Sequence, residues 1–103
     1  MFESIKELFG FKKTYYAQLV KEGAIIVDVR SKGEYAGGHI RGSVNISLDK
    51  IGSNLPMLKK KNKPIITCCA SGMRSASAKS ILKSNGFTEV YNGGAWSSLQ
   101  HKI

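Results

Sequence analysis

Residues 64–75 read Pro-Ile-Ile-Thr-Cys-Cys-Ala-Ser-Gly-Met-Arg-Ser, an apolar run that ends at two adjacent cysteines and leads through a glycine into a helical pattern. The segment Ile65 to Cys68 is short, largely β-branched and uncharged, which is typical of a strand buried on both faces of a parallel sheet. Beyond the loop, apolar residues recur at helical spacing, and Asn85-Gly86 supplies a left-handed stop. The pattern therefore predicts a strand, a tight loop and a helix. Cys69 lies at the carboxyl end of that strand, where open α/β sheets bind their ligands.

The loop after Cys69 has the features of an anion site. We expect its successive backbone N–H groups to point inward around the sulfur, with the dipole of the following helix behind them. Such surroundings stabilise a thiolate, the nucleophilic form, and lower the cysteine pKa from about 8.5 toward about 4 to 7. Gly72 suits a loop position with positive φ, and the Arg74 guanidinium offers a forked donor to an oxyanion. The candidate site is Cys69 with the loop residues Ala70, Ser71, Gly72, Met73, Arg74 and Ser75. A buried structural cysteine is the alternative that this stretch alone leaves open.

A second apolar run, Ala24 to Asp28, predicts another buried strand. Four polar residues lie at or after its carboxyl end: Asp28, Arg30, Glu34 and His39. We expect structural roles for them: the carboxylate at the strand end binds backbone, the arginine pairs with the glutamate, and the histidine packs with a hydrogen bond. Ser31 to Glu34 has the spacing of a capping box, which predicts one helical turn. An acid–base cluster is the alternative interpretation. Two histidines and this pair of cysteines do not predict a metal site.

The length of 103 residues suits one sheet with helices on both faces and is too short for two such units. The composition, 42% hydrophobic and 22% charged, is that of a globular domain. We expect residues 1–12 to form an amphipathic helix or extension and residues 13–103 to form a single domain. No apolar run approaches the roughly 20 residues that cross a membrane, and we expect no signal peptide. Because reactive thiols suit a reducing compartment, we expect a cytoplasmic protein.

The other segments complete an alternating order of helices and strands. They are a helix over residues 14–23, a short strand from Ser43 to Ile46, a helix that Ser47 caps and Pro56 breaks, a last strand from Glu89 to Tyr91, and a closing helix over residues 96–103. This order predicts an α/β domain with an open parallel sheet and helices on both faces. Four strands are expected, with a possible fifth near Phe11 to Lys13.

The densest run of charge precedes the cysteine strand and consists of Lys59, Lys60, Lys61 and Lys63. Since a strand rises about 3.3 Å per residue, this run lies at the opposite edge of the sheet from Cys69. A solvated turn is the simplest interpretation. An acidic protein partner is the more specific one, ahead of nucleic acid, which we do not expect, or an anionic membrane surface. The net charge of +9 favours the approach of small anions without selecting one.

Three stretches, taken together, resemble the rhodanese family of sulfurtransferases. The segment Cys69 to Arg74 is similar to the family's six-residue active-site loop, which opens with a catalytic cysteine. Residues 26–43, which include Ile26 to Arg30 and Gly38 to Ser43, are similar to its first motif, and Gly93-Gly94-Ala95-Trp96 is similar to its C-terminal one. The three occur in order and at compatible spacing over most of the chain.

The resemblance implies a rhodanese-like fold of five strands and a sulfurtransferase that needs no cofactor. The Cys69 thiolate would take the outer sulfur of a donor such as thiosulfate and become a persulfide. The loop amides and Arg74 would hold the departing oxyanion, and cyanide or a thiol would then accept the sulfur.

Two other functions stay open at this point. In a phosphatase or arsenate reductase on the same fold, the cysteine would attack a tetrahedral oxyanion as a nucleophile. The related cell-cycle phosphatases have a loop one residue longer, however, and the spacing from Cys69 to Arg74 favours sulfur transfer. A non-catalytic binding module is the other possibility, although inactive rhodanese-like domains usually lack the cysteine that this chain retains.

Overall fold

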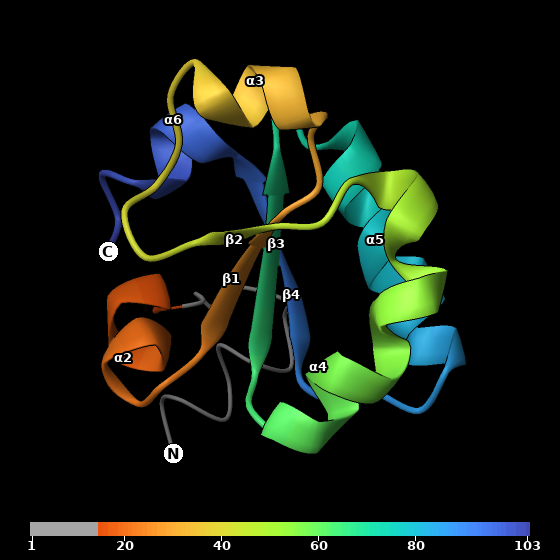
Figure 1. Cartoon of the computed structure of the whole chain (residues 1–103). Coiled ribbons are helices and arrows are strands. Elements are labelled where there is room, and N and C mark those ends of the chain that lie inside the picture. Colours follow the sequence, from red (N-terminus) through yellow and green to blue (C-terminus); the bar gives the residue numbers. More distant parts are fainter. Residues whose placement is uncertain (1–14) are drawn as a thin grey trace.

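The computed structural model describes residues 15–103. Within them lies a parallel sheet of four strands in the order β2-β1-β3-β4 (Figure 1). The strands are β1 (Ile25–Asp28), β2 (Val44–Asn45), β3 (Ile65–Cys69) and β4 (Val90–Ala95). Because β3 pairs with both β1 and β4, the two cysteines at its end lie in the middle of the sheet. The predicted α/β class with a parallel sheet is confirmed.

Helices cover both faces of the sheet, and one further helix lies beyond the carboxyl ends of the strands (Figure 1). The short helices α2 (Tyr16–Lys21) and α6 (Trp96–Leu99) lie on one face. The other face carries α4 (Leu55–Lys61) and α5 (Met73–Ser84), preceded by the 3₁₀ turns η1 (Leu48–Lys50) and η2 (Gly52–Asn54). Helix α3 (Lys32–Ala36) lies beyond the carboxyl ends of the strands, close to the candidate site. Among the described helices, none has the length and apolar character needed to cross a membrane.

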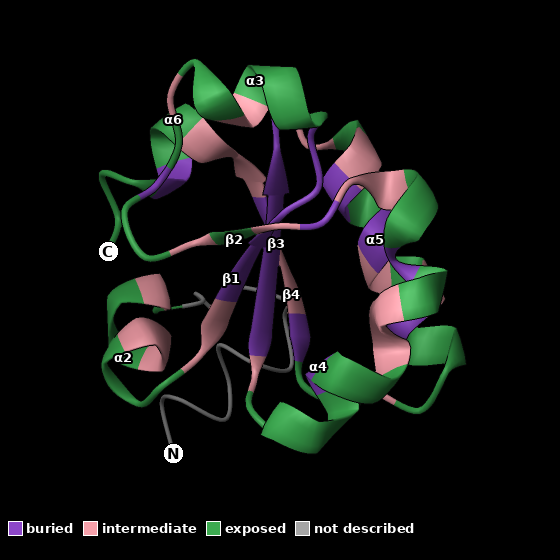
Figure 2. Ribbon diagram, in the orientation of Figure 1, coloured by how far each residue is buried: buried purple, intermediate pink, exposed green. Residues whose placement is uncertain are grey.

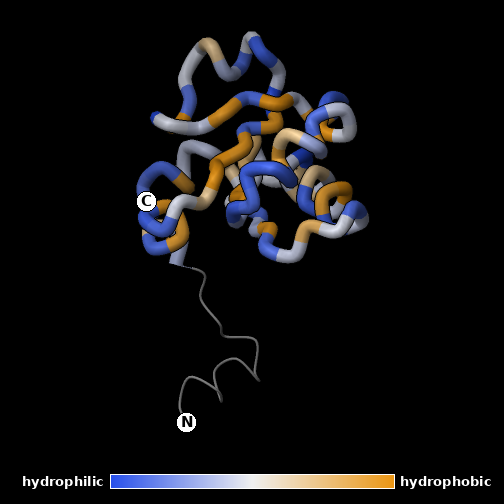
Figure 3. Tube along the Cα trace, turned by 60° about the horizontal axis from the view of Figure 1, so that its bottom comes forward, coloured by the Kyte–Doolittle hydropathy of each residue, from blue (hydrophilic) through white to orange (hydrophobic). Residues whose placement is uncertain are grey.

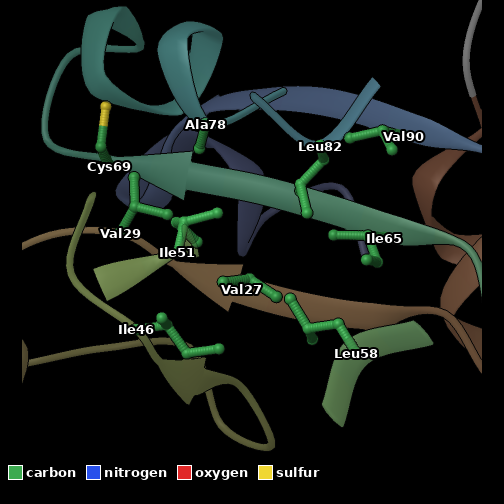
Figure 4. Packing of buried hydrophobic residues seen from close by; sticks show 10 residues of the cluster. All are labelled: Val27, Val29, Ile46, Ile51, Leu58, Ile65, Cys69, Ala78, Leu82 and Val90. Carbon is green, nitrogen blue, oxygen red and sulfur yellow. The ribbon is translucent and has the colours of Figure 1, made fainter. Parts of the chain in front are cut away.

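The two faces of the sheet bury separate clusters of side chains because side chains alternate along a strand. Ile65 and Cys69 face α4 and α5 and belong to the larger cluster, which Figure 4 shows. Ile66 and Cys68 face α2 and α6 with Ile26, Ile40 and Leu99. Burial is greatest in β1 and β3 (Figure 2), and the hydrophobic stretches run through the interior of the domain with hydrophilic segments around them (Figure 3). The adjacent cysteines therefore lie in different chemical surroundings.

The structure corrects three predicted boundaries. Pro56 lies in the first turn of α4, where a missing N–H costs nothing, so it begins a helix where we expected a break. Strand β4 continues to Ala95, past the predicted end at Tyr91, with an irregularity in its pairing to β3 beside the glycine pair. The closing helix ends at Leu99. The helix or extension predicted over residues 1–12 and the fifth strand near Phe11 to Lys13 lie outside the described residues.

The glycine pair of β4 lets this strand pass close to its neighbours. A Cβ atom on Gly93 would lie 2.8 Å from Leu99 Cδ2, 2.9 Å from Ile66 Cγ2 and 2.9 Å from the Thr67 carbonyl oxygen. Gly94 has a φ of 79° and lies beside the cysteine loop, where a Cβ on Gly72 would be 3.5 Å from its Cα. The pair thus allows the end of β4 to approach the loop.

We predict that Gly93→Ala destabilises the domain by about 1 to 3 kcal/mol, because backbone and buried side chains would have to move to admit one methyl group. Gly33→Ala is the matched control, since a Cβ at this helical position has no atom within 4 Å. That control should leave the free energy of unfolding unchanged or raise it by up to about 1 kcal/mol. Urea unfolding measures both changes, and equal effects at the two positions would contradict the packing argument.

Candidate active site

Cys69 ends β3, and its sulfur points toward the loop and the first turn of α5 (Figure 4). The Sγ atom accepts a hydrogen bond from the Gly72 N–H at 2.9 Å and another from the Ser75 N–H at 3.3 Å. Gly72 is the N-cap of α5 and has a φ of 105°, which a residue with a side chain rarely adopts. The loop expected to surround the sulfur is therefore present, with two of its N–H groups at hydrogen-bonding distance.

These hydrogen bonds determine the acidity of Cys69. Burial raises the pKa of its thiol. The Ser75 hydroxyl and the N–H groups of Ser75, Gly72 and Ser71 act in the opposite direction and lower the pKa below its ordinary value, because they stabilise the negative charge on sulfur. The expected direction of the shift is confirmed, and Cys69 is the more acidic of the two cysteines.

Cys68 has the opposite properties. It points to the other face of the sheet, is fully buried, and has a pKa raised to about 12, first by burial and then by the Asp28 carboxylate. At neutral pH it is therefore a neutral thiol packed among apolar side chains. The alternation of side chains along β3 places only Cys69 at the loop.

Arg74 and Glu34 form an ion pair at the rim of the loop. The two guanidinium NH groups donate to the two carboxylate oxygens at 2.8 and 3.0 Å, between side chains that are each 38% exposed. The Arg74 contact, followed by the backbone and hydroxyl of Ser31, lowers the pKa of Glu34 to about 2. The predicted capping box of Ser31 and Glu34 is confirmed, so this carboxylate connects the start of α3 to the start of α5.

The expected pairing of Arg30 with Glu34 is present only through the backbone: Arg30 Nη1 donates to the Glu34 carbonyl oxygen at 3.4 Å, and the Glu34 carboxylate binds Arg74. Arg30 instead donates to both oxygens of Asp28, which also accepts the Arg30 backbone N–H as predicted for a strand-end carboxylate. The pair is buried, and the guanidinium lies 4.7 Å from the Trp96 ring centroid and donates to the Gly38 carbonyl. A buried arginine needs a buried anion, and Asp28 at the end of β1 is the nearer one.

His39 is exposed and follows α3 in the chain. Its ring stacks on Tyr35 at 3.7 Å, and Nδ1 is 2.7 Å from the Tyr35 carbonyl oxygen, so it is the hydrogen-bonded packing residue that we expected. Among the described residues, no group of three or more His, Cys, Asp or Glu side chains is arranged to hold a metal ion. The lysines from Lys59 to Lys63 lie at the end of α4 and before β3, near the amino end of β3 and opposite Cys69, as predicted (Figure 1).

Asn92 of β4 contacts the cysteine loop and was not among the predicted site residues. Its Oδ1 accepts the Ser75 hydroxyl at 2.6 Å and the Gly94 N–H at 2.9 Å, and its Nδ2 donates to the Gly72 carbonyl at 3.3 Å. The feature of the sequence that could have identified Asn92 is its position directly before the glycine pair, just beyond the predicted end of the strand. Asn92 thus joins the loop to a strand that the chain reaches about 20 residues later.

We predict that the two cysteines differ in their reaction with iodoacetamide. In Cys68→Ser protein the remaining Cys69 should react at neutral pH, with a rate that levels off below pH 8.5, the ordinary cysteine pKa. In Cys69→Ser protein the remaining Cys68 should stay unmodified up to strongly alkaline pH, because its pKa is about 12. Mass spectrometry after alkylation measures both, and preferential modification of Cys68 would contradict the assignment.

Comparison of this chain with known proteins, in sequence and in structure, points to one family. The family model of the rhodanese-like domain matches residues 12–98. A thiosulfate sulfurtransferase GlpE from Pseudoalteromonas translucida is 40% identical over 95 residues, covering 84% of this chain and 90% of that protein. Bacillus subtilis YqhL is 38% identical over 69 residues, and the match spans 67% of the chain but only 54% of YqhL. A structure of rhodanese with anions from E. coli is 30% identical, has a TM-score of 0.68, and covers 73% of this chain and 89% of that one. The sheet, the cysteine loop and these matches agree, and the chain belongs to the rhodanese-like domain family.

Proposed function

We propose that this protein is a sulfurtransferase that moves a sulfane sulfur from an anionic donor such as thiosulfate to cyanide or a thiol, through a persulfide on Cys69. The observation that carries the proposal is the pair of N–H groups, from Gly72 and Ser75, that donate to Cys69 Sγ within a loop of six residues. They favour the thiolate that such a reaction needs.

The reaction requires no external oxidant or reductant. The Cys69 thiolate attacks the outer sulfur of thiosulfate, the sulfur–sulfur bond of the donor breaks, and sulfite leaves with the bonding electron pair. The persulfide then has a terminal sulfur that cyanide attacks, which gives thiocyanate and restores the thiolate. Once the Cys69 sulfur is bonded to a second sulfur, it no longer carries the full negative charge. The loop N–H groups can then donate to the persulfide and to the leaving sulfite.

Access to the sulfur requires a small movement of the loop. Cys69 has no exposed surface, whereas its neighbours Ala70 and Ser71 are exposed. A donor therefore reaches Sγ only when these two residues shift outward. No strand has to move for this, because both residues lie between β3 and α5.

Arg74 is placed to bind the anionic end of the donor from the rim. Two of its five N–H donors point to Glu34, which leaves three for an oxyanion among the contacts of the described residues. Glu34 also cancels part of the positive charge at the rim. The donor would therefore be held by directed hydrogen bonds together with the helix dipole of α5, more than by net charge.

The related proteins support the reaction class. The GlpE protein of Pseudoalteromonas translucida is named a thiosulfate sulfurtransferase, and the chain covers nine-tenths of it. The E. coli rhodanese is described with anions, which agrees with an anionic donor.

We also propose that the protein acts in the cytoplasm, where a free thiol stays reduced. An acidic protein partner would bind the lysines from Lys59 to Lys63.

Purified protein should convert thiosulfate and cyanide to thiocyanate, and thiosulfate alone should add the mass of one sulfur atom to the chain. Cys69→Ser should abolish both, and Cys68→Ser should retain both, because only Cys69 lies at the loop. Colorimetric thiocyanate detection and intact-mass spectrometry measure the two effects. Turnover of aryl phosphates without thiocyanate formation would show instead that the site is a phosphatase.

Arg74→Ala should raise the KM for thiosulfate by roughly tenfold to hundredfold, the range expected for a lost hydrogen bond to a charged group. Glu34→Gln keeps the guanidinium and removes the competing charge, so it should leave KM unchanged or lower it. Lys60→Ala, at the opposite edge, should have little effect. Steady-state kinetics separates these cases, and a loss from Lys60→Ala equal to that from Arg74→Ala would point to long-range charge rather than contact.

A further inference from the structure

The Ser75 hydroxyl lies among three groups that can share its hydrogen bonds but has only one proton to donate. Its Oγ is 2.6 Å from Asn92 Oδ1, 3.1 Å from the Gly72 carbonyl oxygen and 3.4 Å from Cys69 Sγ. Ser75 is fully buried, so water does not provide an alternative partner. The group that receives the proton therefore determines whether the Ser75 hydroxyl presents a proton or an oxygen lone pair to the sulfur.

The orientation of the Asn92 amide is fixed by two other contacts. The Gly94 N–H donates to Oδ1 at 2.9 Å, which identifies this atom as the oxygen, and Nδ2 donates to the Gly72 carbonyl at 3.3 Å. The Gly72 carbonyl is thus already an acceptor for Asn92. The nearest acceptor for the Ser75 proton is Asn92 Oδ1, at 2.6 Å, and a hydroxyl that donates to it turns a lone pair toward Cys69.

This arrangement suits the thiol better than the thiolate. A neutral Cys69 donates its S–H to Ser75 Oγ, as the 3.4 Å contact is oriented. The Ser75 hydroxyl lowers the Cys69 pKa only when its proton points to the sulfur, and a thiolate gains that hydrogen bond only if the hydroxyl turns away from Asn92. Two oxygen atoms would then face each other at 2.6 Å without a proton between them. The asparagine carbonyl and the sulfur anion therefore compete for one hydrogen bond.

We propose that Asn92 is a positioning residue for the Cys69 nucleophile, whose carbonyl oxygen holds the Ser75 hydroxyl proton away from the sulfur and so restrains thiolate formation. Such restraint makes the resting thiol less open to chance oxidation, while the N–H groups of Gly72 and Ser75 still support the anion. The role in sulfur transfer rests on the function proposed above. The effect on the thiol can be measured without any donor.

The charged and titratable groups around Cys69 do not provide the same effect. Arg74 at the start of α5 carries a charge that acts on the sulfur, but Glu34 of α3 pairs with it. On β3 itself, the Cys68 thiol stays neutral, and on β1 the Asp28 carboxylate is paired with Arg30. In β4, Tyr91 packs with the cluster on the opposite face, and Asn92 acts as a neutral hydrogen-bonding group.

The test is the pKa of Cys69, followed by the ultraviolet absorbance of the thiolate in a Cys68→Ser background, which needs no access to the sulfur. Asn92→Ala should lower this pKa by roughly 0.5 to 1, the worth of one hydrogen bond, since Ser75 is then free to donate to the thiolate. Asn92→Asp keeps the shape and adds a negative charge and a stronger acceptor, so it should raise the pKa. Asn85→Ala, which removes an exposed asparagine at the far end of α5, should leave it unchanged.

A double-mutant cycle shows whether the effect passes through Ser75. When Ser75→Ala is already present, Asn92→Ala should no longer lower the Cys69 pKa. An unchanged or higher pKa in Asn92→Ala, or an equal fall with and without the Ser75 hydroxyl, would overturn the proposal. Thiocyanate formation by Cys68→Ser protein, measured in parallel, reports separately on the sulfurtransferase function, so failure of one inference is distinguishable from failure of the other.

Discussion

The hydrogen bonds from the Gly72 and Ser75 N–H groups to the Cys69 sulfur are the contacts on which the proposed chemistry depends. They require a strand that ends in the middle of the sheet, a glycine with positive φ, and a helix that starts at once beyond it. Without these contacts burial alone would keep Cys69 protonated, as it does Cys68 one residue earlier. Two adjacent cysteines of one strand thus differ in chemistry because they face different layers of the fold.

The neighbouring elements hold this loop from several sides. Glu34 joins the start of α3 to Arg74 on the rim, and Asn92 joins β4 to the carbonyl of Gly72 and the hydroxyl of Ser75. Beneath α3, Asp28 and Arg30 form a buried pair that also holds the Gly38 carbonyl. Polar groups that are satisfied in this way favour one conformation of the loop and leave few ways for it to relax.

Much of this arrangement could be predicted from local sequence. The strand, loop and helix around Cys69, the positive φ of Gly72, and the capping box of Ser31 and Glu34 each follow from residues within about ten positions of one another. The errors concern contacts between distant segments. Glu34 pairs with Arg74, 40 residues later, where we expected Arg30, and Asn92 contacts a loop 20 residues earlier. The first pair depends on how α3 and α5 meet, and the Asn92 contact depends on how far β4 extends, which the glycine pair made hard to predict.

These hydrogen bonds to the Cys69 sulfur can be tested by a pH titration of Cys68→Ser protein, followed by nuclear magnetic resonance of the backbone amides. If Gly72 and Ser75 donate to the Cys69 sulfur, their two amide signals should move with one common midpoint that lies below about 8.5, the ordinary cysteine pKa. The same two signals should stay in place over this pH range in Cys69→Ser protein. If these amide signals do not change as Cys69 ionises, or if their midpoint lies above the ordinary cysteine pKa, the Gly72 and Ser75 N–H groups do not stabilise the thiolate.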